Sequence, residues 1–188
     1  MSKLIIPGPG RFGSLHDHQQ KAVTLWQENC ERGLAGEQAQ VGLWVYGDRG
    51  AGSTYIASTA AKRMVREIDD DFAWDYVTAT NLMDRIRESW SANKVSQGNS
   101  GDYDLYVESA SFEDAVRKLW DLKLLWIDDL YEEHDITFFR KHALPRLFQR
   151  VKSGLPTVIA TDMPPGDPQL DGLEKVIQIW FVTCYAER

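Results

Sequence analysis

Residues 41–62 have the sequence V-G-L-W-V-Y-G-D-R-G-A-G-S-T-Y-I-A-S-T-A-A-K, which predicts a buried strand, a glycine-rich loop and a helix in that order. Three glycines, Gly47, Gly50 and Gly52, follow directly on the β-rich residues 43–46. Glycine adopts positive φ values and lets a ligand approach the backbone, so successive N–H groups can point into one cavity at a helix N-terminus. The stretch therefore predicts a phosphate-binding loop.

The loop matches the pattern G-x-x-x-x-G-K-[ST] at every fixed position except one. Gly47, Gly52 and Thr54 agree with it, and Ser53 stands where the pattern has lysine. That lysine would reach the β- and γ-phosphates and carry charge into the transition state, so its loss is more compatible with nucleotide binding than with hydrolysis. The alternative is a strand–helix turn that uses its glycines for geometry alone. This motif by itself does not decide between the two.

The composition predicts one domain, because 188 residues suffice for a single sizeable core but not for two. We expect a flexible arm over residues 1–15 and one domain over residues 16–188. No apolar run approaches the roughly 18 residues of a membrane span, and Cys30 and Cys184 lack C-x-x-C spacing. A cytoplasmic protein with reduced thiols and no membrane partner is expected. The net charge of −7 means that any DNA contact needs a local basic patch or a partner protein.

Apolar periodicity and turn residues predict helices and strands in alternation. The segment 91–104, S-A-N-K-V-S-Q-G-N-S-G-D-Y-D, is expected to be a long loop. The expected helices cover residues 17–32, 54–68, 82–90, 111–120 and 137–152, the expected strands cover residues 43–46, 72–77, 122–127 and 155–162, and residues 170–188 continue as a helix and then a strand. Pro145 is expected to kink or split the helix 137–152.

Two carboxylates, Asp128 and Asp129, end the hydrophobic strand 122–127. Ligands of open α/β sheets bind at the carboxyl ends of the strands. In a protein with a phosphate-binding loop, the first carboxylate would hold Mg²⁺ and the second would orient or activate the attacking water. The alternative is a simple strand-end turn in which an aspartate caps the next element. The pair's position after a glycine loop in a βαβ series favours the metal site.

The helix 137–152 is the most basic element of the chain. Its cations, together with two arginines of the expected helix 82–90, are candidates for contact with single-stranded DNA. An ordinary solvated face is the alternative. The residues concerned are Arg85, Arg87, Arg140, Lys141, Arg146, Arg150 and Lys152.

With these motifs in place, the chain resembles the DnaC/IstB-like branch of AAA+ ATPases, the bacterial and phage helicase-loader family. The resemblance covers about residues 17–165. It rests on Y-G-D-R-G-A-G-S-T from Tyr46, Y-V-T-A-T-N-L-M-D-R-I-R from Tyr76, L-K-L-L-W-I-D-D-L from Leu122 and G-L-P-T-V-I-A-T-D-M-P-P from Gly154. It implies an α/β fold with a P-loop NTPase core of the AAA+/RecA-like type, in which helices flank a mostly parallel sheet. It also implies ATP or ADP with Mg²⁺ as cofactors and a replicative helicase or related ATPase as partner, with single-stranded DNA a further candidate.

By this resemblance, Thr54 and Asp128 bind the metal, while Asp129 and Asp162 are the catalytic positions. The nucleotide-binding loop consists of Gly47, Asp48, Arg49, Gly50, Ala51, Gly52, Ser53 and Thr54. The chain departs from the family at three places: Ser53 replaces lysine, Asp162 replaces asparagine, and a late arginine is absent from residues 176–180, where Ile179 lies. The site thus loses two positive charges and gains a negative one, which weakens ATP binding and raises the hydrolysis barrier. Arg49 is a candidate substitute for the lysine.

Three functions are consistent with these observations. The first is an ATP-dependent helicase loader, phage-like in its short core. The second is a degenerate AAA+ pseudo-ATPase that keeps the fold and binds a protein or DNA. The third is an unrelated α/β enzyme that uses the carboxylate pair Asp128 and Asp129 for metal-assisted hydrolysis, which the family resemblance disfavours. AAA+ modules commonly assemble, so an oligomer is a further expectation, although no arginine stands out to complete a neighbour's site.

Overall fold

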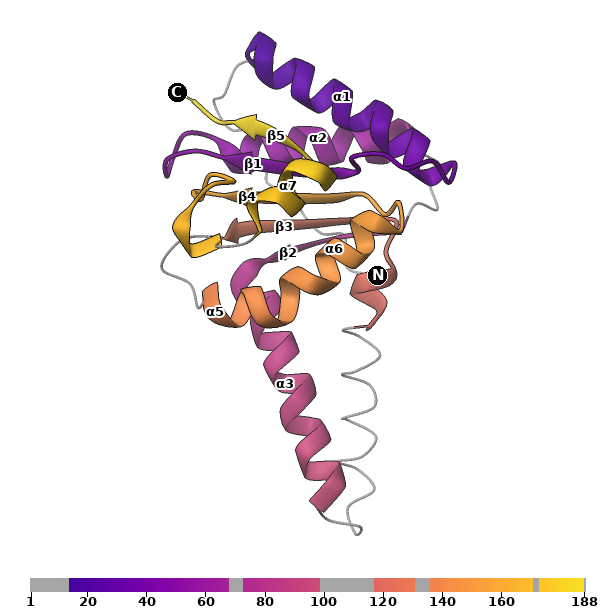
Figure 1. Ribbon diagram of the computed structural model, residues 1–188, viewed down its shortest axis with the longest axis vertical. Coiled ribbons are helices and arrows are strands. Elements are labelled where there is room, and N and C mark those ends of the chain that lie inside the picture. The colour runs from indigo at the N-terminus through magenta and orange to yellow at the C-terminus, as the bar shows by residue number, and fades with distance from the viewer. Residues whose placement is uncertain (1–13, 68–72, 99–116, 131–135, 171–172, 188) are drawn as a thin grey trace.

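A computed structural model describes residues 14–67, 73–98, 117–130, 136–170 and 173–187 of the chain (Figure 1). Its sheet has five strands in the order β2-β3-β4-β1-β5, and every pair is parallel. The strands are β1 (Gly42–Tyr46), β2 (Trp74–Thr78), β3 (Leu124–Leu130), β4 (Thr157–Thr161) and β5 (Phe181–Tyr185). The predicted α/β class, with helices flanking a parallel sheet, is confirmed.

Helices cover both faces of this sheet. In Figure 1, α2 lies behind the strands, α6 and α7 lie in front of them, and α1 packs along the edge formed by β5. The helices are α1 (Asp17–Leu34), α2 (Ser53–Glu67), α3 (Ala79–Gly98), α5 (Ile136–Phe138), α6 (Leu144–Lys152) and α7 (Glu174–Trp180). Because both faces are covered, the central strands β3 and β4 are buried almost throughout and are hydrophobic without alternation.

The helix α3 is longer than the sequence predicted. It continues to Gly98 and projects away from the sheet (Figure 1), so the loop expected over residues 91–104 is wrong for residues 91–98. Those eight residues contain no proline and only one glycine, at their end, so nothing in them stops a helix that has already formed. Residues 99–104, the start of the helix expected at residue 111, and the acidic triplet 69–71 lie outside the described residues. Helical structure is described for residues 117–121.

The predicted helix 137–152 consists of three pieces. Between α5 and α6 lies a π-helical turn, Phe139–Ala143. Pro145 lies in the first turn of α6, where its missing N–H is tolerated. The π-turn lies just before the proline, so the regular α-helix expected over residues 137–152 is interrupted there while the backbone stays helical.

Tryptophans at the centre of the core also position the sheet. Trp44 and Trp126 are fully buried. The indole N–H of Trp44 donates to the carbonyl of Met163, 3.0 Å away, and that of Trp26 donates to the carbonyl of Val41, 2.9 Å away. These bonds tie the segment after β4 to β1, and α1 to the residue before β1. β1, the strand that leads into the glycine loop, is therefore held by α1 and by the segment after β4.

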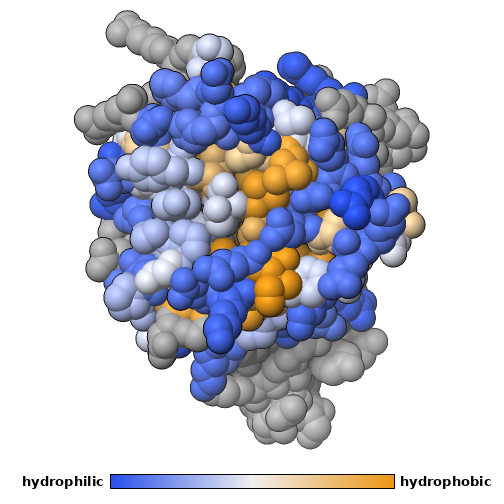
Figure 2. All heavy atoms as spheres, turned by 45° about the horizontal axis from the view of Figure 1, so that its top comes forward, coloured by the Kyte–Doolittle hydropathy of each residue, from blue (hydrophilic) through white to orange (hydrophobic). Residues whose placement is uncertain are grey.

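The molecular surface is mostly polar. Figure 2 shows one face on which hydrophilic residues predominate and hydrophobic side chains show in the middle. Among the described residues, the large hydrophobic side chains that remain exposed are Leu25, Leu34, Ile179 and Tyr185. No described helix has the length and apolar character that crossing a bilayer requires. The expected arm over residues 1–15 falls almost entirely outside the described residues, so the division into arm and domain stays a prediction.

Candidate nucleotide site

Parallel pairing brings three predicted segments together at the carboxyl edge of the sheet. In the register of β1 and β4, Tyr46 lies opposite Thr161, and the amide of Gly47 donates to the carbonyl of Thr161 over 3.3 Å. The ladder between β3 and β4 shifts between Ile127 and Leu130, where Leu130 also lies opposite Thr161. The glycine loop, the carboxylate pair and the residue after β4 therefore lie side by side, as ligand sites of open α/β sheets require.

The glycines of the loop are needed for its geometry. Gly50 and Gly52 have φ values of 80° and 101°, a region that residues with a side chain rarely adopt. Gly47 has a different role, because a Cβ there would lie 2.3 Å from the carbonyl oxygen of Ala186. The amide of Ala51 donates to the carbonyl of Asp48 over 2.8 Å and closes the turn. Packing alone explains Gly47, whereas the conformations of Gly50 and Gly52 are those of a cradle that can hold a phosphate.

Thr54 and Asp128 meet beneath this loop. The Thr54 hydroxyl donates to Oδ1 of Asp128 over 3.1 Å, and the Asp128 side chain is 1% exposed. Burial, followed by the charge of Asp129, raises the pKa of Asp128 to about 6. Hydrogen bonds from the Asp129 backbone, Thr54 and Tyr76 lower that pKa and offset only part of the rise. A buried carboxylate that faces a hydroxyl at a helix start has the chemistry of a hard-cation site.

Tyr76 is a member of this cluster that the sequence did not identify. Its phenol donates a hydrogen bond to Asp128, and its ring packs edge-on against Trp126, 4.5 Å away between centroids. Burial, followed by the charges of Asp128 and Asp129, raises the pKa of Tyr76 to about 12. The register places Tyr76 opposite Trp126, two residues before the pair Thr78 and Asp128, so the phenol and the carboxylate share one face of the sheet. The contact between Tyr76 and Asp128 depends on the pairing of β2 with β3, so it could not be read from the sequence.

Asp129 adopts a strained backbone conformation. Its φ is 55°, the only positive φ of a non-glycine residue in the part of the chain that the structure describes. This strain costs about 1–3 kcal/mol and is typical of functional sites. It coincides with the register shift in β3 between Ile127 and Leu130. Asp129 is near enough for its charge to raise the pKa of both Asp128 and Tyr76.

The loop carries one cation, Arg49. Its Nε lies 3.9 Å from Oδ2 of Asp162, the residue that follows β4. The Arg49 side chain is 54% exposed and that of Asp162 is 18% exposed. Ser53 is half-buried at the first position of α2. Asp162, the predicted catalytic position, therefore lies next to the glycine loop, where its side chain forms an ion pair with Arg49.

The oxygen donors at this edge fit Mg²⁺, and the loop fits a phosphate. Thr54 and Asp128 would hold the ion, and the loop amides together with Arg49 would hold phosphate oxygens. No group of three or more metal-binding side chains occurs among the described residues. A metal bound here would therefore take its remaining ligands from water or phosphate, which is how Mg²⁺ is commonly bound. When bound, the ion would neutralise phosphate charge.

The segment that lacks the expected late arginine forms α7 and leads into β5. Within it, Ile179 is 57% exposed. β5 pairs with β1, so that Tyr185 lies opposite Tyr46 and the chain passes close to the loop at Ala186. The amide of Ala186 donates to the carbonyl of Tyr46 over 2.7 Å. The C-terminal strand therefore supports the start of the loop.

The structure corrects one part of the basic surface predicted on the helix 137–152. Arg150 is 3% exposed, so it cannot contact DNA. Its guanidinium donates to the carbonyls of Leu119, Trp120, Leu122 and Pro156 and to the hydroxyl of Thr157. Five donors thus join α6, the helical segment 117–121 and the starts of β3 and β4. Burial lowers the pKa of Arg150 to about 10, against an opposing effect of Asp121.

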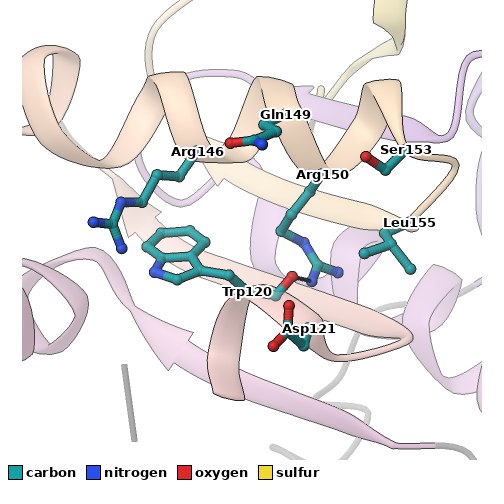
Figure 3. A pocket seen from close by; sticks show the side chains of 7 residues that line it. All are labelled: Trp120, Asp121, Arg146, Gln149, Arg150, Ser153 and Leu155. Carbon is teal, nitrogen blue, oxygen red and sulfur yellow. Dashed lines mark hydrogen bonds between the residues drawn. The ribbon is translucent and has the colours of Figure 1, made fainter. Parts of the chain in front are cut away.

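This arginine forms a wall of a polar pocket of about 380 Å³ (Figure 3). Trp120 and Asp121 lie across it from Arg146 and Arg150 of α6, and the Arg146 guanidinium lies 5.8 Å from the Trp120 ring centroid. All five N–H groups of Arg150 are used within the protein. The pocket lies beside the starts of β3 and β4, at the opposite edge of the sheet from the glycine loop. It is therefore separate from the candidate nucleotide site.

Of the other predicted basic residues, Arg87 lies against the segment that leads into Arg140 and Lys141. The Arg87 guanidinium of α3 lies 4.4 Å from the centroid of the Phe138 ring, and the Phe138 ring lies 4.8 Å from that of His142. Burial, and then the charges of Lys141 and Arg146, lower the pKa of His142. α3 and the π-turn therefore lie side by side, and contact of their cations with DNA stays a prediction.

No protein-family model and no curated protein matches this sequence. Solved structures do match. Domain III of the Thermotoga maritima replication initiation protein DnaA superposes with a TM-score of 0.63 at 18% identity, over 92% of this chain and 64% of that one. The DnaC helicase loader superposes with a TM-score of 0.62 at 14% identity, over 94% of both chains. The replication initiator DnaA bound to AMPPCP and single-stranded DNA gives 0.58 at 15% identity, over 93% and 48%.

The chain thus spans less than two thirds of either DnaA chain. At identities of 14–18%, these superpositions show that the fold is shared and do not show a shared activity. The predicted resemblance to the helicase-loader family is confirmed at this level, and the chain has the AAA+ P-loop NTPase fold.

Proposed function

We propose that this chain is a nucleotide-binding AAA+ protein of DNA replication that acts in the cytoplasm as a helicase loader or loader-like factor. The observation that carries the proposal is the hydrogen bond between Thr54 and Asp128, directly beneath a glycine loop with two positive φ values. Similarity to the DnaC helicase loader over 94% of both chains supports the replication role. The partner would be a replicative helicase or a related ATPase.

In this proposal the ligand is ATP or ADP with Mg²⁺. Loop amides other than those of Gly47 and Ala51, which already donate to Thr161 and Asp48, would bind its phosphates, and Thr54 and Asp128 would hold the metal ion. Asp129 orients the attacking water, and Asp162 contacts the region of the terminal phosphate. Ser53 cannot carry charge to the β- and γ-phosphates, so the transition state for hydrolysis is stabilised poorly. Binding with slow turnover is the expected behaviour.

Calorimetry of ATP and ADP binding with Mg²⁺, on the native chain and on Ser53→Lys, tests the proposal. The ATPase rate is measured on the same two proteins. We expect the native chain to bind and the lysine variant to bind more tightly, with turnover appearing or rising. Absence of binding in both proteins would mean that the loop is a strand–helix turn and would overturn the proposal.

A second candidate is a pseudo-ATPase that uses the fold to bind a protein or DNA without turnover. The presence of Ser53 and of Asp162, which adds negative charge beside the loop, favours it. Complex formation with a replicative helicase, measured by analytical ultracentrifugation with and without ATP, separates the two. A loader is expected to respond to nucleotide, and a pseudo-ATPase is expected to bind equally well with or without it. The same experiment reports whether the chain forms an oligomer.

A further inference from the structure

We propose that Arg49 is the phosphate-binding cation of this site and that Asp162 restrains it, so that a ligand phosphate must displace the Asp162 carboxylate. The inference rests on the proposed nucleotide-binding function and assigns a role to the pair Arg49 and Asp162. It starts from an observed ion pair, in which Arg49 Nε lies 3.9 Å from Asp162 Oδ2.

The position of the cation within the loop supports the first half. Arg49 is the only lysine or arginine in residues 41–61. The next two cations along the chain, Lys62 and Arg63, lie in the third turn of α2, and Arg63 donates to Gln20 of α1 over 2.8 Å. Arg49 is therefore the cation that the loop itself supplies. A guanidinium also offers paired donors that match the oxygens of a phosphate.

Strand pairing explains why Asp162 reaches this arginine. Thr161 is the last residue of β4 and lies opposite Tyr46, the last residue of β1. The amide of Gly47 donates to the carbonyl of Thr161, so the residues that follow each strand start from adjacent positions. Asp162 is held there by the segment after it, because Met163 accepts the indole N–H of Trp44. The carboxylate thus occupies a fixed place beside the loop.

The exposure of the two side chains allows the exchange of partners. Arg49 is 54% exposed and Asp162 is 18% exposed, at a separation longer than a direct hydrogen bond. A half-exposed pair of this kind contributes little stability. A phosphate group carries more charge than a carboxylate and forms stronger paired hydrogen bonds with a guanidinium. Phosphate therefore outcompetes Asp162 for Arg49, although the Asp162 carboxylate then lies near the charge of the phosphate.

A double-mutant cycle tests this inference. Binding of ADP and ATP with Mg²⁺ is measured by calorimetry on the native chain, Asp162→Asn, Arg49→Gln and the double variant. We expect Asp162→Asn to tighten binding about tenfold and Arg49→Gln to weaken it about tenfold. In the Arg49→Gln background, Asp162→Asn should gain less than about threefold, because no arginine remains to be released.

Two outcomes would overturn the inference. If Asp162→Asn tightened binding equally with and without Arg49, the aspartate would act by charge alone. If it failed to tighten binding at all, Asp162 would not restrain the site. The Ser53→Lys protein separates these failures from failure of the proposed function, because its lysine does not depend on Arg49. Binding by Ser53→Lys with no gain from Asp162→Asn contradicts only the inference, whereas no binding by any protein contradicts the nucleotide site. Circular dichroism and melting temperature confirm that each variant is folded.

Discussion

The Thr54 hydroxyl lies 3.1 Å from Oδ1 of Asp128, although 74 residues separate the two in the chain. Thr54 is the second residue of α2 and Asp128 lies near the end of β3, so a single hydrogen bond joins the glycine loop to the carboxylate pair. The bond satisfies a carboxylate that is 1% exposed. Stability and the proposed binding function therefore depend on the same contact.

Thr54→Val keeps the shape of the side chain and removes its hydroxyl. Asp128 would lose one of the hydrogen bonds that lower its pKa, and the metal would lose a ligand. We expect the affinity for ADP with Mg²⁺ to fall roughly tenfold or more. Calorimetry measures this change. Thr59→Val is the matched control, since the Thr59 hydroxyl only donates to the Tyr55 carbonyl of the same helix; an equal loss in both variants would contradict the assignment.

Asp128→Asn should stabilise the protein at neutral pH. The pKa of Asp128 is raised from 3.8 to about 6 in the folded chain, so the folded state binds the proton more tightly than the unfolded state. Asp128 therefore does not lower the free energy of unfolding below about pH 4, and it lowers that free energy increasingly as the pH rises from 4 to 6. Above pH 6 the full cost is about 2–3 kcal/mol.

Urea unfolding of the native chain and Asp128→Asn at pH 4.5, 6 and 7.5 measures this effect. The difference between the two proteins isolates Asp128 from the other carboxylates. The variant's advantage should grow as the pH rises. An advantage that is constant or shrinks with pH would show that the pKa of Asp128 is not raised in the folded protein.

Arg150→Lys keeps the positive charge and should nevertheless destabilise the fold. An ammonium cannot reproduce five donors in a planar arrangement, so several buried carbonyls would lose their partner. We expect a loss of about 2–4 kcal/mol in the free energy of unfolding, measured in urea. The exposed Arg146 provides the control on the same helix, and Arg146→Lys should change stability by less than about 1 kcal/mol. Similar losses in both would contradict the structural role of Arg150.

The surface formed by α3 and the π-turn should bind single-stranded DNA. Replacing Arg140 and Lys141 with alanine should weaken binding of a labelled oligonucleotide, measured by fluorescence anisotropy. The slope of log affinity against log salt should become shallower by roughly 0.7 for each phosphate that the variant no longer neutralises. The control replaces two other exposed cations, Lys21 of α1 and Arg66 of α2, with alanine and so removes the same amount of positive charge from a different part of the surface. Equal effects of the two double variants would show nonspecific attraction in place of a defined surface.

Much of the candidate site was predictable because its signals are local. The glycines of residues 47–52 require particular backbone angles, and carboxylates at the end of a hydrophobic run mark the edge where ligands bind. Pro145 lies in the first turn of α6, directly after the π-turn that interrupts the predicted helix. The structure shows the positive φ values of Gly50 and Gly52 and the position of the carboxylates in β3, and ligand binding at this edge stays a prediction. The extent of α3 was predicted wrongly, since polar residues without a helix breaker are compatible with both a loop and a helix.

Patterns along the chain were therefore enough to predict the strand–loop–helix unit, the carboxylate pair and the α/β class. Which side chains meet across these elements depends on the three-dimensional packing. The pairing of β2 with β3 brings Tyr76 to Asp128, and the pairing of β1 with β4 brings Asp162 to Arg49. Burial removed Arg150 from the basic surface to which its sequence position assigned it. The physical reason is that contacts between strands depend on their order and register in the sheet, which arise from packing of the whole core and leave no local signal along the chain.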